Sequence, residues 1–405
     1  MFEILSRDAI ERPHELYAKM RAVAPICQVE HGWWAVSRHR DVVFVLKHPE
    51  LFSSTDVRSQ RDAAIDKRLR GGIVFPESAS IIGNDPPVHT RLRKMVMGAF
   101  APAAMSRLEP RIRAITTDLI DRILERNVFD IVPHLATPLP VTVIAEMLGV
   151  DSSRQRDFKR RSDAIINIDV VAERTDAEVE RILQSRREFR SYIEQLFEER
   201  RAHPREDLIS DLCRSEEGDA SATTDEVLSL AVTLLVAGNV TTTNLIGTGA
   251  LALAEDPEIF DALRRDADVV PRFIEEVLRF DGPVKMLMRR ATTDVELAGV
   301  TIPSGAMVVP LIASANRDPE VFPNPDTFDI TRDNRGRGHV SFGFGIHFCI
   351  GAALSRLEGR VVFEEIAQRL PSFSRSAPGP LAWAHTLGLR GLTTLPLQFD
   401  TRVAA

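Results

Sequence analysis

Long stretches of this sequence place apolar residues at helical spacing. Residues 102–204 are amphipathic with this period, and the charge-rich part from 173 to 201 is typical of helices that face solvent. Thr223-Thr224-Asp225-Glu226 has the pattern of a capping box and predicts a helix that runs to about Ala254. About 30 residues correspond to roughly 45 Å of helix. Because this segment is apolar on almost every side, we expect it to cross the protein interior.

Shorter segments toward both ends of the chain alternate in polarity or carry turn signals. Trp33-Trp34-Ala35-Val36 is typical of a strand, and residues 41–46 are typical of a short helix. Residues 295–305 combine alternation with glycine and proline, which predicts hairpins. A last strong helix is expected from about Gly351. In the absence of a repeat or a linker, residues 1–405 are predicted to form one mainly α-helical domain with small β-sheets.

The composition is that of an ordinary globular protein. Hydrophobic residues make up 44% and charged residues 27% of the 405 residues, and the formal net charge is -7. This charge gives no overall attraction to nucleic acid or to an anionic membrane. The N-terminus lacks an apolar core of signal-peptide length, and polar residues interrupt the apolar stretch around 227–237, which favours a buried helix over a membrane span. Cys27, Cys213 and Cys349 lie far apart, which argues against a zinc site or a disulfide framework and fits a reducing cytoplasm.

The segment with the most specific chemistry is Phe342-Gly343-Phe344-Gly345-Ile346-His347-Phe348-Cys349-Ile350-Gly351. Its glycines let the backbone bend tightly and approach a flat cofactor, and its cysteine stands just before a predicted helix. A helix start and nearby backbone N–H groups favour a thiolate, so we expect a lowered pKa for the Cys349 thiol. A lone cysteine beside a glycine turn is usually a buried structural residue, and this alternative stays open on the residues alone.

This pattern matches FGxGxHxCxG and resembles the haem-binding loop of the cytochromes P450, in particular the soluble bacterial ones. The resemblance extends over nearly the whole chain. It implies the cytochrome P450 fold, with haem b between the long central helix and the cysteine loop. It further implies that Cys349 is the axial ligand of the iron, and that Phe342, Gly343, His347 and Gly351 bind the cofactor.

Glu276 and Arg279 are oppositely charged and stand three residues apart in the sequence. By itself this spacing is typical of a surface ion pair worth under about 1 kcal/mol. Glu276 and Arg279 are similar to the family's ExxR pair, which implies that they are buried and joined by Arg332. The expected role of this network is folding and haem incorporation rather than bond chemistry.

Cationic and donor side chains occur at three further places. His89 and Arg93 are one helical turn apart, a spacing that alone is typical of a solvated helix face. The resemblance implies instead that His89, Arg93, Arg289 and His347 hold the haem propionates. Two carboxylates and four donor groups are chemically well matched.

The segment Ala237-Gly238-Asn239-Val240-Thr241-Thr242 of the long helix resembles the family's oxygen-activation motif, AGx(D/E)TT. Small residues at Ala237 and Gly238 would leave room above the iron, and Thr241 would hydrogen-bond to dioxygen or a water. Simple helix packing is the alternative interpretation. The chain departs from the motif at Val240, which replaces an acid and cannot relay a proton. Asn239 or an ordered water chain could take over this role.

The resemblance implies a monooxygenase, which takes electrons from NAD(P)H through ferredoxin reductase and a ferredoxin. The ferredoxin would dock where Arg107, Arg356 and Arg360 cluster, and a cytoplasmic monomer is expected. Val240 motivates an alternative, a P450-type reductase or peroxide-driven catalyst similar to the nitric oxide reductases of the family. A haem-based sensor without turnover is a third hypothesis.

By resemblance, the distal pocket is lined by mostly apolar residues, namely Phe75, Val236, Val284, Leu287 and Leu389. A hydrophobic small molecule such as a terpenoid, steroid, fatty acid or polyketide is therefore the expected substrate. Lys285 could meet a carboxylate, but a lysine that faces solvent is the more common case.

Overall fold

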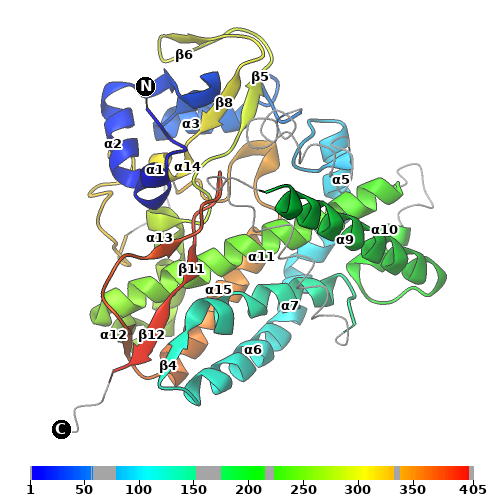
Figure 1. Cartoon of the computed structure of the whole chain (residues 1–405), viewed down its shortest axis with the longest axis vertical. Coiled ribbons are helices and arrows are strands. Elements are labelled where there is room, and N and C mark those ends of the chain that lie inside the picture. Colours follow the sequence, from blue (N-terminus) through cyan, green and yellow to red (C-terminus); the bar gives the residue numbers. More distant parts are fainter. Residues whose placement is uncertain are drawn as a thin grey trace.

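A computed structural model of the chain describes residues 2–55, 57, 79–151, 175–214, 223–332 and 338–400. Helices make up most of it, and small sheets lie at two of its edges (Figure 1). The α-helices are α1 (Arg7–Glu11), α2 (Pro13–Val23), α3 (His39–Lys47), α5 (Val88–Met97), α6 (Pro102–Leu124), α7 (Pro138–Met147), α9 (Asp176–Ala202), α10 (Leu208–Arg214), α11 (Thr224–Glu255), α12 (Pro257–Arg265), α13 (Val270–Asp281), α14 (Ile312–Ala315) and α15 (Ala352–Arg369). Shorter helical turns are η1 (Glu30–Gly32), η4 (Gly98–Phe100), η5 (Val132–Ala136), η8 (Ala267–Val269) and η9 (Gly345–His347).

The strands are short and form four sheets in the described part of the chain. They are β1 (Ile26–Gln28), β2 (Trp34–Val36), β3 (Phe52–Ser53), β4 (Val128–Asp130), β5 (Arg289–Ala291), β6 (Val295–Leu297), β7 (Val300–Ile302), β8 (Met307–Pro310), β9 (Phe373–Arg375), β10 (Ala382–Trp383), β11 (Leu392–Thr394) and β12 (Pro396–Phe399). The largest sheet has the order β1-β2-β8-β5-β3, with β2 and β8 parallel and the other pairs antiparallel. The β6–β7 hairpin lies within the segment predicted to form hairpins.

The long central helix α11 forms as predicted. Its N-cap Thr223 accepts a hydrogen bond from the Glu226 N–H at 3.3 Å, and the Glu226 carboxylate accepts one from the Thr223 N–H at 2.9 Å. The helix crosses the protein (Figure 1) and, by length and composition alone, could span a membrane. However, 61% of its most apolar window is buried inside the protein, which is the pattern of a core helix.

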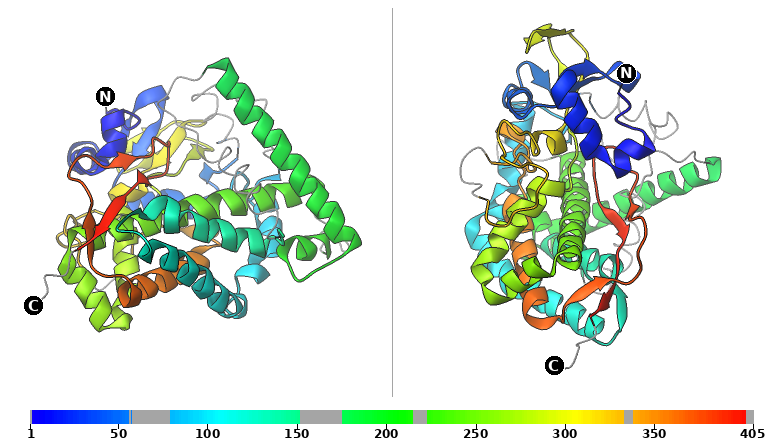
Figure 2. Two further views of the ribbon diagram at one scale, coloured as in Figure 1. Left: turned by 60° about the horizontal axis from the view of Figure 1, so that its bottom comes forward. Right: turned by 90° about the vertical axis from the view of Figure 1, so that its left-hand side faces the viewer.

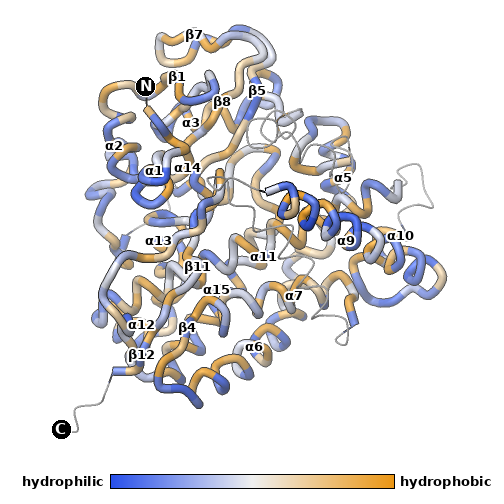
Figure 3. The backbone as a smooth tube through the Cα atoms, in the orientation of Figure 1, coloured by the Kyte–Doolittle hydropathy of each residue, from blue (hydrophilic) through white to orange (hydrophobic). Residues whose placement is uncertain are grey.

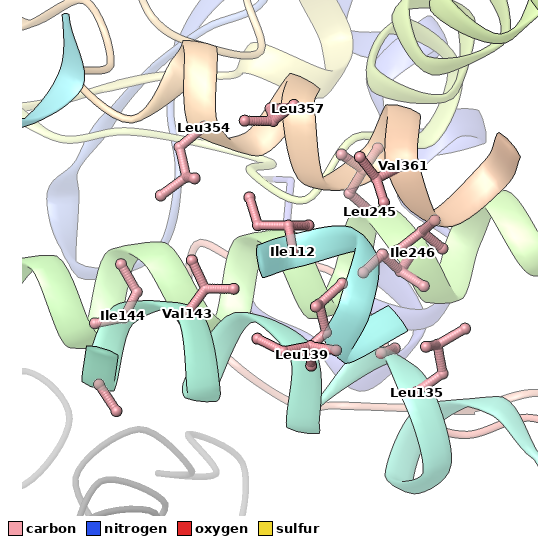
Figure 4. Close-up of a cluster of buried hydrophobic side chains, with 14 of the residues drawn as sticks. Ile112, Leu135, Leu139, Val143, Ile144, Leu245, Ile246, Leu354, Leu357 and Val361 are labelled. Atoms are coloured by element: carbon pink, nitrogen blue, oxygen red, sulfur yellow. The ribbon is translucent and has the colours of Figure 1, made fainter. Parts of the chain in front are cut away.

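The core is built where α6, η5, α7 and α15 pack around α11. Figure 4 shows side chains from these elements meeting there, including Ile112, Leu139, Ile144, Leu245 and Val361. Each fully buried aliphatic side chain of this kind contributes about 1.5–3 kcal/mol relative to exposure. The core therefore fixes α11 and α15, the two helices that carry the predicted oxygen motif and follow the cysteine loop.

Helix α9 partly departs from the prediction of a solvent-facing helix. It lies at the edge of the molecule (Figure 2), and its outward surface is hydrophilic (Figure 3). Its inner face buries Phe189, Ile193 and Phe197, and Arg200 forms a buried ion pair with Asp207 at 2.5 Å. A charge-rich sequence can therefore still carry a buried stripe, because one face of a long helix suffices for packing.

Candidate functional site

The cysteine loop is held in a fixed shape by its glycines and its own backbone. Gly343 and Gly345 have φ values of 72° and 71°, which are left-handed and favour glycine. A Cβ on Gly345 would lie 2.6 Å from the carbonyl oxygen of Leu46, so a side chain has no room there. The Cys349 N–H donates to the carbonyl of Phe342 at 2.8 Å and closes the loop just before α15 begins.

Cys349 stands at the end of the cysteine loop, just before α15. It is exposed to solvent, yet burial by surrounding protein is the largest influence on its thiol and raises the pKa. The Gly351 N–H and the charges of Arg93 and Arg356 act in the opposite direction. The predicted lowering of the pKa is therefore wrong for the net balance, because desolvation outweighs the helix start and both cations.

The four predicted cationic and donor residues come together beside this loop. The rings of His89 and His347 are 4.3 Å apart, and Arg93 donates to the carbonyl of Phe348 at 2.8 Å. Arg289, on β5, is buried and donates to the carbonyl of Met288 at 2.8 Å. We call His89, Arg93, Arg289 and His347 the donor cluster.

The donor cluster has an excess of positive charge and unsatisfied donors. Neither ring nitrogen of buried His89 has a hydrogen-bond partner in the part of the chain that the structure describes. Within the same residues, Arg289 forms no ion pair with a carboxylate, and burial lowers its pKa to about 10. Burial, followed by the charges of Arg289, His89 and Arg93, lowers the pKa of His347 to about 3. An anionic group placed here would therefore gain both charge and hydrogen bonds.

The oxygen motif presents different residues on different faces of α11. Ala237 is exposed although it stands in the middle of a core helix, and Thr241 donates to its carbonyl at 2.6 Å. Val240 and Thr241 are partly exposed on the same side. Ala237, Val240 and Thr241 thus give this core helix one face that the described residues do not fully cover.

Asn239 and Gly238 face helix α7 and η5 instead. Asn239 is buried, and its side-chain oxygen accepts a hydrogen bond at 3.3 Å from Thr243, which also bonds to Ala136. A Cβ on Gly238 would lie 3.0 Å from the Ile144 side chain. The Asn239 side chain is therefore engaged with Thr243, and the absence of a side chain at Gly238 leaves room for Ile144 of α7.

A buried acid that the sequence analysis missed lies next to this motif. Glu358 on α15 is fully buried and hydrogen-bonds to Thr242, and its Oε1 has no hydrogen-bond partner among the described residues. Burial raises the pKa of Glu358 to about 8, despite the opposing hydrogen bond from Thr242. Helical spacing was the available signal, because Glu358 shares a face with the core residues Leu354 and Val361.

The ExxR pair and its predicted third member form a buried network. Glu276 accepts from Arg279 at 2.7 and 2.8 Å, from Arg332 at 3.4 Å and from the Asp329 N–H at 2.8 Å. The side chains of Glu276 and Arg279 are fully buried. The remaining donors of Arg279 bond to backbone carbonyls, those of Asn316, Pro325 and Thr327. This network joins α13 to the segment that precedes the cysteine loop.

Several predicted pocket residues lie close together. Val284 and Leu389 form an isolated antiparallel bridge, and the Leu287 side chain lies 3.9 Å from the Cβ position of Gly343. Val236 is partly buried on α11, and Phe75 lies outside the described residues.

The prediction that Lys285 faces solvent is wrong. Its side chain is fully buried, and its Nζ has no hydrogen-bond partner among the described residues. The reason lies in its backbone. The Lys285 N–H donates a hydrogen bond to the carbonyl of Gly388, and the Lys285 carbonyl accepts one from the Ala313 N–H, which holds the segment inside the protein. Burial lowers the pKa of Lys285 to about 7.

The predicted docking arginines are largely charge-balanced. Arg356 pairs with Glu275 at 2.6 Å, and Arg360 pairs with Glu109 at 2.7 Å and Glu364 at 3.1 Å. Arg107 is exposed. The surface therefore carries less net positive charge than the sequence indicates.

The helical fold and the glycine-bent cysteine loop define a haem-thiolate class of protein. Residues 13–374 match the family model described as Cytochrome P450. The chain is 36% identical over 398 residues to 6-deoxyerythronolide B hydroxylase of Saccharopolyspora erythraea, with 96% of each chain covered. It matches the solved structure of CYP109Q5 from Chondromyces apiculatus with a TM-score of 0.88 and 40% identity over 99% of both chains. CYP109E1 from Bacillus megaterium, solved in complex with testosterone, matches with a TM-score of 0.85 and 35% identity over 98% of this chain and 100% of that one.

The chain belongs to the cytochrome P450 family, and it is an enzyme of this monooxygenase family. The family implies a haem cofactor, generally with redox partners and hydrophobic substrates. The residues present fit this cofactor: both ring nitrogens of buried His89 lack a partner among the described residues, buried Arg289 has no carboxylate partner there, and Cys349 and Ala237 are exposed.

Proposed function

We propose that this protein is a haem-thiolate monooxygenase that inserts one oxygen atom from dioxygen into a hydrophobic small molecule, by hydroxylation or epoxidation. The observation that carries this proposal is the exposed Cys349 thiol beside the donor cluster, in a chain of this family. When bound, haem b supplies the activation of dioxygen, favoured by a cysteine ligand. Residues 1–405 would form a single catalytic domain.

The donor cluster would hold the haem through its propionates. Arg93 and Arg289 supply the positive charges, and His89 and His347 supply neutral N–H donors because burial and the arginines lower the pKa of each imidazole. Phe342, Gly343 and Gly351 would contact the porphyrin from the cysteine side, where the bent loop lets backbone approach a flat ring. In this interpretation the four donors replace water around the carboxylates.

The proton that Val240 cannot relay would come from Glu358. A carboxyl whose pKa is raised to about 8 by burial carries a proton at neutral pH. Its hydrogen-bond partner Thr242 is next in sequence to Thr241, the hydroxyl on the exposed face of α11. A Glu358 Oε–H proton would pass to the Thr242 hydroxyl, which would release its own proton toward Thr241 and water.

Coupling of NADH consumption to product formation tests this route. Glu358→Gln should lower coupling several-fold, and Val240→Asp should raise it in both the wild-type and the Glu358→Gln background. Unchanged or lower coupling in Val240→Asp would contradict a makeshift route and would mean that the valine is adapted to its task.

The substrate is proposed to be an apolar polyketide or steroid. Val236, Val284, Leu287 and Leu389 are the described residues proposed to line its pocket, together with Phe75. One relative is named as a hydroxylase of 6-deoxyerythronolide B and another was solved with testosterone, which supports this class. Binding of each candidate is measured as the spectral change that accompanies displacement of water from the haem.

Electrons are proposed to come from NAD(P)H through a ferredoxin reductase and a ferredoxin that docks near Arg107, with the enzyme a monomer in the cytoplasm. NADH oxidation with and without surrogate partners, under air and then anaerobically with nitric oxide, tests this. Consumption under air that needs the partners supports the monooxygenase. Rapid consumption without them, driven by nitric oxide, would support the reductase alternative, which the hydroxylase relatives do not favour.

The cysteine ligand has its own test. Cys349→Ser should abolish the thiolate signature in the spectrum of the reduced carbon monoxide complex. Retention of that signature would refute the assignment of Cys349.

A further inference from the structure

Glu275, His339 and Arg356 form a connected cluster beside the cysteine loop. Arg356, on α15, donates to the two carboxylate oxygens of Glu275 at 2.6 and 3.0 Å. His339, from the segment before the loop, contacts the same carboxylate through Nε2 at 3.1 Å. The guanidinium carbon of Arg356 lies 4.4 Å from the centre of the Phe342 ring. One carboxylate on α13 thus holds a cation over the first residue of the cysteine motif.

The cluster has one defined hydrogen-bond direction at the histidine. His339 Nδ1 accepts from the Ser341 N–H at 3.2 Å, so its proton resides on Nε2 and is donated to Glu275. Burial raises the pKa of Glu275, but the hydrogen bonds from His339 and Arg356 outweigh it and bring the pKa to about 2. Glu275 is therefore an anion at neutral pH, and it offsets the charge of Arg356.

This charge pair is coupled to the cysteine through Phe342. The carbonyl of Phe342 accepts the hydrogen bond from the Cys349 N–H at 2.8 Å. The Arg356 guanidinium lies over the ring of the same Phe342. Arg360 is one helical turn away on α15 and equally paired with carboxylates, but its partners are Glu109 and Glu364 rather than Glu275.

We propose that Glu275, His339 and Arg356 are positioning residues that set the reduction potential of the haem iron, with Glu275 and His339 fixing the Arg356 charge over Phe342. A positive charge near the iron favours the state that has gained an electron, and a negative charge opposes it. The balance between Arg356 and Glu275 thereby adjusts how readily one electron is accepted. This inference rests on the proposed function, because it takes Cys349 as the iron ligand.

The test is a spectroelectrochemical titration of the purified, haem-loaded full chain, with dithionite as the reductant and redox mediators. Glu275→Gln keeps hydrogen-bonding atoms but removes the negative charge. The ratio of ferrous to ferric haem at a given potential should therefore rise at least threefold. Arg356→Gln should lower it at least threefold. For a one-electron couple, threefold corresponds to about 28 mV, from 59 mV per tenfold. Arg360→Gln is the matched control and should change the equilibrium less than twofold.

Opposite shifts of at least threefold in the two variants, with a change below twofold in the control, support the proposal. Any other pattern overturns it, including equal shifts in Arg356→Gln and Arg360→Gln. Haem content and the unfolding midpoint of each variant identify any that misfolds. If Arg356→Gln misfolds, the charge-preserving Arg356→Lys replaces it. Its reduction potential should stay near the wild-type value if the charge is the cause. The carbon monoxide spectrum of the wild type separates the two levels: without a thiolate signature the proposed function fails, whereas a normal signature with unmoved potentials refutes only the cluster.

Discussion

Glu276→Ala should be among the most destabilising single substitutions in this protein. The substitution removes the acceptor of two Arg279 hydrogen bonds, at 2.7 and 2.8 Å, and leaves a fully buried guanidinium without its counter-ion. Breaking a buried pair in this way costs about 3–5 kcal/mol. Arg279 keeps its bonds to three backbone carbonyls, so we expect the lower end, about 3 kcal/mol, or a factor of roughly 10² in the unfolding equilibrium constant.

The assay is chemical denaturation followed by tryptophan fluorescence, together with the haem content of the purified protein. Asp118→Ala is the matched control, because Asp118 and Arg122 form an ion pair on α6 whose side chains are 64% and 66% exposed. Such an exposed pair contributes at most about 0.5 kcal/mol. A cost for Glu276→Ala within about 1 kcal/mol of the control would refute the view that this network holds the fold together.

Three further substitutions probe the buried groups. Arg289→Met should stabilise the protein prepared without haem, because it removes an unpaired buried cation. The same substitution should weaken haem retention at least tenfold, measured by transfer of haem to an acceptor protein. Destabilisation of the haem-free protein would contradict this expectation. Glu358→Gln should gain stability relative to wild type as pH rises from 4.5 to about 8, by up to about 1.4 kcal/mol per pH unit, because folded Glu358 keeps a proton that the unfolded chain releases; parallel pH profiles would be the opposing result. Gly249→Ala should cost about 1–3 kcal/mol in the free energy of unfolding, because a Cβ would overlap the Phe363 ring, and an unchanged midpoint would show that the ring moves aside.

Local patterns predicted the elements that depend on nearby residues. The capping box at Thr223 and the mainly apolar composition were sufficient to place α11, because both act within one helix. The cysteine loop was likewise predictable, since left-handed turns at Gly343 and Gly345 leave a direct trace in the sequence. These features needed no knowledge of what packs against them.

Properties that depend on distant neighbours could not be predicted. Lys285 is buried because Gly388 and Ala313 bond to its backbone, and neither is close in sequence. The direction of Asn239 depends on Thr243 and on η5, which lies about a hundred residues earlier. The pKa of Cys349 is set by the amount of protein around it, a quantity that its ten-residue motif does not contain.

The largest sheet has a consequence for how the chain is made. Strands β1, β2 and β3 lie within residues 26–53, but β2 pairs with β8 and β3 pairs with β5, both from residues 289–310. During synthesis, the first three strands therefore leave the ribosome long before their partners and keep unpaired edges through most of translation. Ser54, just after β3, must also wait for His347, with which it hydrogen-bonds at 3.1 Å. The cofactor pocket can close only when nearly the whole polypeptide has emerged, which makes its assembly a late, post-translational event.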